Sequence, residues 1–89
     1  MNWEEIIKRT NAKVPPEYAM DPPLRKAYEK GAKNSFNMED FEKKYWWEVE
    51  QKLLFPAEYA MNEVLHRAYA KGAEVSYRIQ KEMVEDDRK

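Results

Sequence analysis

The chain has 89 residues, 43% of them hydrophobic and 13% aromatic, which is enough apolar material for a core and too much for a disordered chain. Its 16 Lys and Arg residues nearly balance its 17 Asp and Glu residues, and this balance argues against non-specific nucleic-acid binding. Because there is no cysteine, secretory signal or apolar run long enough to cross a membrane, we expect one cytoplasmic domain spanning residues 1–89, with no disulfide.

The first predicted helix begins directly after Asn2. The Asn2 side chain can cap this helix, and Glu5 follows three residues later, which is the spacing of a capping box. We expect the helix to end before Lys13, the first residue of the stretch KVPP, because a residue before proline avoids the α conformation.

A second helix is predicted from Asp21 onward. The Asp21 side chain can accept hydrogen bonds from free amides, and Pro22 suits the first helical position because an N–H there would have no helical partner. A third helix is predicted at about residues 38–54, starting after Asn37. Apolar residues recur in it at every fourth position, namely Phe41, Tyr45, Val49 and Leu53.

Pro56 ends the third predicted helix, and a fourth is expected at about residues 57–85. Signals for strands are poor, because β-branched residues are few and no hairpin turn dipeptide occurs. The fold class predicted from the sequence is therefore all-α, a small bundle of about four helices.

Two stretches of the chain are nearly the same. Residues 17–32 read EYAMDPPLRKAYEKGA and residues 58–73 read EYAMNEVLHRAYAKGA, which match at ten of sixteen positions with an offset of 41. We interpret this match as an internal duplication, with repeat units at about 14–38 and 55–79 joined by the helix at about 38–54. Because a solenoid needs three or more units, we expect the two units to close on each other about a pseudo-two-fold axis.

The only two glycines stand at matched positions in the repeats. Each follows an alanine by four residues, so that Ala27 pairs with Gly31 and Ala68 pairs with Gly72. Since glycine inside a helix costs about 1 kcal/mol relative to alanine, its presence in both copies favours a close helix–helix crossing. The alternative is that each glycine only ends its helix as a C-cap. The predicted seam of the second copy has the spacing of a coiled coil and consists of Met61, Leu65, Ala68, Gly72, Val75 and Ile79.

Aromatic residues indicate a second apolar face. Tyr45, Trp46 and Trp47 are consecutive, and neighbours point about 100° apart on a helix, so the three cannot all face one core. Either a wide buried face holds both tryptophans, or one of them belongs to a partner surface, for which tryptophan is a frequent residue. The matched aromatic residues on the side opposite the predicted seam are Tyr18, Tyr59, Phe36 and Tyr77. We expect this second face to be covered by other helices or by a second copy of the chain, as in a homodimer.

Few residues suggest chemistry. Glu63 and His66 have the Glu-x-x-His spacing of di-metal carboxylate bundles, but the first repeat has Pro22 and Arg25 instead, so a metal site would need a second chain. Otherwise Glu63 and His66 are ordinary solvated or pair-forming residues, and we expect no metal or other cofactor. With one histidine and no cysteine, nucleophilic catalysis is not expected.

The sequence thus favours a non-catalytic protein–protein interaction module that presents a helical aromatic face to an unidentified protein partner or to itself. The first alternative is a ferritin-like, metal-binding helical oligomer based on Glu63 and His66. The second is single-stranded nucleic-acid binding, in which Trp46 or Trp47 would stack on bases beside Lys43 and Lys44.

Overall fold

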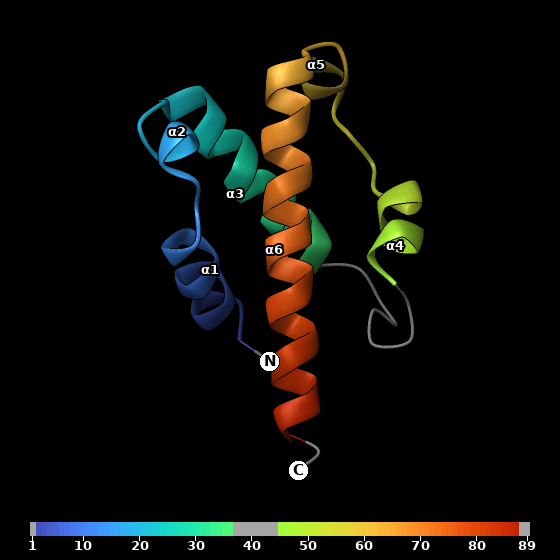
Figure 1. Cartoon of the computed structure of the whole chain (residues 1–89). Coiled ribbons are helices and arrows are strands. Elements are labelled where there is room, and N and C mark those ends of the chain that lie inside the picture. Colours follow the sequence, from blue (N-terminus) through green and yellow to red (C-terminus); the bar gives the residue numbers. More distant parts are fainter. Residues whose placement is uncertain (1, 37–44, 88–89) are drawn as a thin grey trace.

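The structure of the chain, a computed structural model, describes residues 2–36 and 45–87 (Figure 1). All regular secondary structure in these ranges is helical, so the predicted all-α fold class is confirmed. The helices are α1 (Trp3–Ala12), α2 (Pro16–Ala19), α3 (Pro22–Phe36), α4 (Trp46–Lys52), α5 (Ala57–Ala60) and α6 (Glu63–Asp87).

The described ranges hold six helices where the sequence predicted about four. The helix expected at about 57–85 is interrupted, because the single turn α5 ends at Ala60 and α6 starts anew at Glu63. The single turn α2 stands in the same way before α3. Within the helix expected at about 38–54, α4 covers only Trp46–Lys52, and the predicted start at Asn37 lies outside the described residues.

Local hydrogen bonds account for the start of α1. The Asn2 side chain accepts a hydrogen bond from the backbone N–H of Glu4 over 2.8 Å, so Asn2 caps the helix as predicted. The predicted capping box does not form as expected: the Glu5 carboxylate accepts a 3.0 Å hydrogen bond from Arg9, one turn further along the helix.

The two long helices begin in different ways. Among the described residues no hydrogen bond to the Asp21 side chain is found, and Pro22 and Pro23 have no N–H to donate. At the matched position, Asn62 accepts hydrogen bonds from the backbone N–H groups of Val64 (3.0 Å) and Leu65 (3.2 Å). The interruption before α6 therefore has a local cause, because Asn62 is a good N-cap residue.

The backbones of the two repeats match closely around the single-turn helices. Pro15 has φ −59° and ψ 141°, and Pro56 has φ −56° and ψ 146°. Met20 has φ −88° and ψ −6°, and Met61 has φ −89° and ψ −7°. In each copy a proline in extended conformation leads into one helical turn, after which the chain turns into the long helix. The origin of this likeness by duplication stays an interpretation.

The helices α3 and α6 cross at the two glycines, beside each other at the centre of the molecule (Figure 1). A Cβ atom on Gly31 would lie 2.7 Å from the carbonyl carbon of Tyr69 and still closer to its oxygen. A Cβ atom on Gly72 would meet the carbonyl group of Tyr28 in the same way. Both glycines lie inside their helices, so neither is the C-cap that was the alternative.

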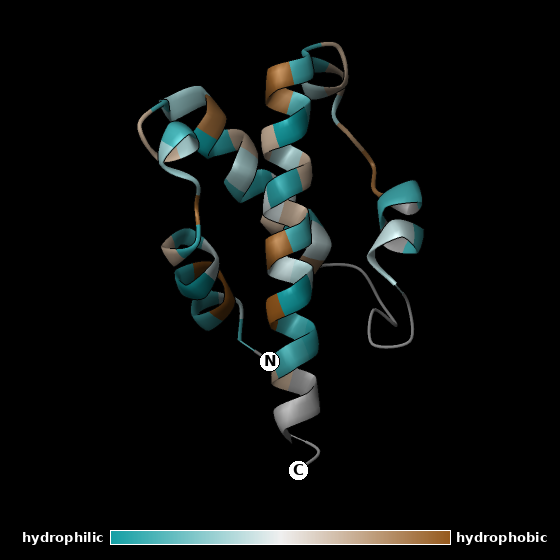
Figure 2. Ribbon diagram, viewed as in Figure 1, coloured by the Kyte–Doolittle hydropathy of each residue, from teal (hydrophilic) through white to brown (hydrophobic). Residues whose placement is uncertain are grey.

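The core surrounds this crossing. Ala27, Ala32, Ala68 and Ala73 are buried completely, and small residues here let the helix backbones come close. The outer faces of the long helices are largely hydrophilic, whereas the linkers before α2 and before α5 are in part hydrophobic (Figure 2). The predicted seam does not extend to Met61, which is 90% exposed because the helix is broken there.

Candidate functional site

The tyrosines beside the glycines fasten each long helix to the segment that precedes it. Tyr28 is fully buried, and its hydroxyl donates a 2.7 Å hydrogen bond to the carbonyl oxygen of Thr10. Burial raises the pKa of Tyr28 from 10.0 to about 12, because the phenolate would lose its hydration. Tyr28 therefore holds the end of α1 against α3.

Tyr69, at the position matched to Tyr28, holds α6 to the segment that precedes it in the second half. Its hydroxyl donates to the carbonyl oxygen of Leu54 over 3.1 Å and accepts a 2.7 Å hydrogen bond from the Asn34 side chain. Burial raises the pKa of Tyr69, and the hydrogen bond from Asn34 partly offsets the rise. Asn34 also donates to the Leu54 carbonyl over 3.0 Å, so the linker before α5 is tied to both long helices.

The interface candidates Tyr59 and Tyr77 are not on the surface. Their exposed fractions are 5% and 2%, so the expectation that they face a partner does not hold. The short turn between α5 and α6 folds Tyr59 back onto Tyr69, with ring centroids 5.4 Å apart. The ring of Tyr77 packs against that of Trp46 of α4, with centroids 5.7 Å apart. The second apolar side of α6 is thus covered at these positions by other helices of the same chain, which was one of the two alternatives.

Two further candidates, Tyr18 and Phe36, are partly buried. The ring centroids of Tyr18 and Tyr28 lie 6.5 Å apart. This contact in the first half corresponds to the one between Tyr59 and Tyr69 in the second. The ring of Phe36 packs against that of Trp3, with centroids 5.2 Å apart and an interplanar angle of 47°. The rings of Trp46 and Tyr77 meet at the same angle. Tyr18 and Phe36 thus contact other aromatic side chains of the chain and keep part of their surface exposed.

The adjacent tryptophans of α4 have different surroundings. Trp46 is partly buried against Tyr77, whereas Trp47 is 59% exposed. Tyr45, directly before them, is 68% exposed, and Leu54, after the helix, is 80% exposed. We name Tyr45, Trp47 and Leu54 together the α4 surface. Lys43 and Lys44, the cations that the nucleic-acid alternative requires, lie outside the described residues.

Glu63 and His66 make contacts of other kinds. The Glu63 carboxylate pairs with Arg67, and the His66 ring stacks on Phe55 with centroids 4.0 Å apart and an interplanar angle of 24°. Within the described ranges, no three His, Cys, Asp or Glu side chains gather where they could hold a metal ion. Glu63 and His66 therefore lack further ligands from the described part of their own chain.

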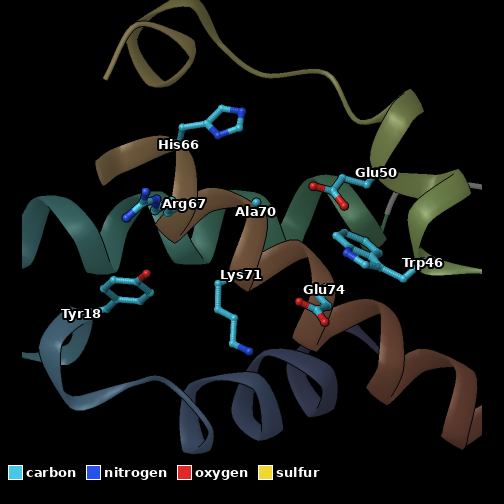
Figure 3. Close-up of a pocket in the computed structure, with 8 residues that line it drawn as sticks. All are labelled: Tyr18, Trp46, Glu50, His66, Arg67, Ala70, Lys71 and Glu74. Carbon is cyan, nitrogen blue, oxygen red and sulfur yellow. The ribbon is translucent and has the colours of Figure 1, made fainter. Parts of the chain in front are cut away.

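Sequence reasoning missed a pocket of about 320 Å³ on the outer face of α6 (Figure 3). Ala70 lies near its middle, and side chains from three helices surround it. The surrounding residues are Tyr18 from α2, Trp46 and Glu50 from α4, and His66, Arg67, Lys71 and Glu74 from α6. The spacing of four residues from His66 through Ala70 to Glu74 places one face of α6 there. The positions of α2 and α4 on either side had no signal in the sequence.

Comparison of the chain with protein-family models, curated protein sequences and solved structures found no match. Among the helices that the structure describes, none is both long and apolar enough to cross a membrane.

Proposed function

We propose that the chain is a non-catalytic protein-binding module that acts through the α4 surface, toward a second copy of itself or toward another protein. The observation that carries the proposal is the exposure of Trp47 between two further exposed apolar side chains, Tyr45 and Leu54. Single exposed hydrophobic residues are common on proteins, but here three large ones fall within ten residues of the sequence, which favours an interface at this segment.

The α4 surface has properties that suit binding. Tryptophan and tyrosine contribute large apolar areas with few rotatable bonds, so they lose little conformational entropy when a partner covers them. The start of α4 is held by the Glu48 carboxylate, which accepts a 3.2 Å hydrogen bond from the backbone N–H of Tyr45. The Lys81 ammonium group lies 5.9 Å from the centre of the Tyr45 ring and so links this ring to α6. These contacts support an aromatic surface that is ordered before binding.

The experiment that tests the proposal compares Trp47→Ala with the wild-type protein. Sedimentation velocity measures self-association, and affinity capture from a lysate treated with nuclease, read by mass spectrometry, detects other partners. We expect the wild-type chain to form a dimer or retain a specific protein, and Trp47→Ala to lose that association with its helical circular dichroism unchanged.

Val64→Ala is the matched control, because Val64 is exposed as well but lies at the start of α6. It should associate as the wild-type chain does. A wild-type chain that stays monomeric and retains no protein would contradict the proposal, and so would a Trp47→Ala chain that associates normally.

A further inference from the structure

The pocket on α6 contains two opposite charges that do not pair. Within the described residues, Lys71 of α6 and Glu50 of α4 each lack an ion-pair partner, and they form no ion pair with each other across the pocket. Two opposite charges beside one pocket would gain by contact if they could reach each other. Because they stay apart, each is free for a ligand group of the opposite sign.

Other side chains around the pocket lie on either side of Ala70. In Figure 3, Arg67 and Tyr18 lie on one side of Ala70, and Glu50, Trp46 and Glu74 lie on the other. Arg67 pairs with Glu63, and Glu74 pairs with Arg78 over 2.8 Å, with the arginine exposed in both pairs. Exposed ion pairs of this kind are weak, so both groups can also face a ligand.

The lysine at the matched place in the first half contacts other side chains of the protein. Lys30 matches Lys71, and its ammonium group lies 3.8 Å from the Glu58 carboxylate and 5.6 Å from the centre of the Tyr59 ring. Glu29 occupies the position matched to Ala70. The Glu29 carboxylate pairs with Arg25 over 3.6 Å. The residues that line the pocket on α6 thus differ in side-chain size and pairing from those at the matched positions of α3.

We propose that this pocket binds a small ligand that carries a carboxylate at one end and a cationic ammonium or guanidinium group at the other. The carboxylate would lie against Lys71 and Arg67. The cation would lie against Glu50 and over the ring of Trp46, which is the aromatic type that attracts cations best. A volume of about 320 Å³ suits a ligand of amino-acid size. The ligand chemistry is that of a basic amino acid, either free or as the last residue of a peptide chain.

The test is a titration of the full chain with L-arginine, followed by the NMR signal of the Trp46 indole N–H, which Trp46→Phe assigns. We expect the signal to shift and saturate, with a Kd in roughly the millimolar range for so small a ligand in an open pocket. Agmatine, which is arginine without its carboxylate, should bind about tenfold more weakly or worse. Equal binding of agmatine and arginine, or no shift up to about 50 mM arginine, would overturn the proposal.

Two further probes distinguish the sources of the ligand. A short peptide that ends in arginine should bind more tightly than free arginine if chain ends are the ligand, and more weakly if the free amino acid is. The same peptide with an amidated end should lose binding in either case, because it lacks the carboxylate. Retained binding by the amidated peptide would contradict the assignment of the carboxylate to Lys71 and Arg67.

Variants locate the site. Lys71→Gln and Glu50→Gln, both exposed changes that should leave the fold intact, are each expected to weaken arginine binding about tenfold. The matched control Lys30→Gln should leave it unchanged. Ala70→Glu gives α6 the residue that α3 has at Glu29 and should abolish binding. Unaltered affinity in Lys71→Gln and Glu50→Gln would place the ligand elsewhere and overturn the proposal.

The inference does not rest on the proposed protein-binding function. Trp47 lies outside the pocket lining, so Trp47→Ala should bind arginine as the wild-type chain does even though it loses protein association. Each proposal can therefore fail while the other stands.

Discussion

Gly31 of α3 lies against the main chain of Tyr69 of α6 so closely that a Cβ atom at residue 31 would stand 2.7 Å from the Tyr69 carbonyl carbon. The reciprocal contact joins Gly72 to the main chain of Tyr28. Residues 28 and 31 match residues 69 and 72 at the offset of the repeat. The same two types of residue thus make the same contact twice, once from each helix.

Gly31→Ala should destabilise the protein by about 2–4 kcal/mol, because the added methyl group meets rigid backbone and the helices must move apart. Gly72→Ala should cost a similar amount. At an open helical position the same change would stabilise by up to about 1 kcal/mol, since alanine is the better helix former. Urea unfolding followed by circular dichroism measures the difference. Lys26→Ala, on the exposed face of α3, serves as the control, and a Gly31→Ala chain as stable as this control would show that the helices do not meet there.

The matched serines provide a second comparison. Both are fully buried, but Ser76 donates a 3.0 Å hydrogen bond to the carbonyl oxygen of Ala32, whereas the Ser35 hydroxyl has no hydrogen-bond partner in the described part of the chain. Ser76 also accepts a 3.0 Å hydrogen bond from Gln80. Ser76→Ala should therefore cost about 1–2 kcal/mol, and Ser35→Ala should be neutral or stabilising. Thermal unfolding of the two variants measures this, and equal losses in both would contradict the assigned hydrogen bonds.

The buried Tyr28 should make stability depend on alkaline pH. Its pKa is raised from 10.0 in the unfolded chain to about 12 in the folded protein, so its contribution is complete below pH 10 and is lost as the pH rises toward 12. Two pKa units correspond to about 2–3 kcal/mol of unfolding free energy. Tyr28→Phe removes this titration, and it also costs about 1 kcal/mol at neutral pH through loss of the bond to Thr10.

Urea unfolding of both proteins at about pH 9 and at about pH 11 separates the contribution of Tyr28 from that of the lysines, which titrate in the same range. The wild-type chain should lose more stability over this interval than Tyr28→Phe does. Parallel losses in the two proteins would show that Tyr28 is accessible to hydroxide in the folded state.

The two helix starts should respond differently to alanine. Asn62→Ala removes an acceptor that holds two backbone N–H groups of α6, and it should cost about 1 kcal/mol. Asp21→Ala removes a side chain to which no hydrogen bond is found among the described residues, so its effect should stay within about 0.5 kcal/mol. Thermal unfolding of the pair tests this directly, and a larger loss in Asp21→Ala than in Asn62→Ala would reverse the assignment.

The all-α fold and several helix limits could be predicted from the sequence because they depend on local chemistry. Asn2 caps α1 through a hydrogen bond within its own turn, and Pro22 begins α3 because its ring allows only a few positions in a helix. Asn62 carries a similar local signal, but the apolar spacing that continues across it favours one uninterrupted helix instead. The repeat by itself puts Gly31 and Gly72 at equivalent positions, since the offset of 41 relates them.

The tertiary structure decided which faces are covered. The burial of Tyr77 depends on where α4 lies, and the exposure of Trp47 depends on how that helix is rotated. Neither the burial of Tyr77 nor the exposure of Trp47 can be predicted from the neighbouring sequence alone. The pocket likewise exists because α2 and α4 stand on either side of Ala70, at residues far from it in sequence. Local hydrogen bonding and proline geometry are encoded within a few residues, whereas a surface between helices arises only when distant segments pack.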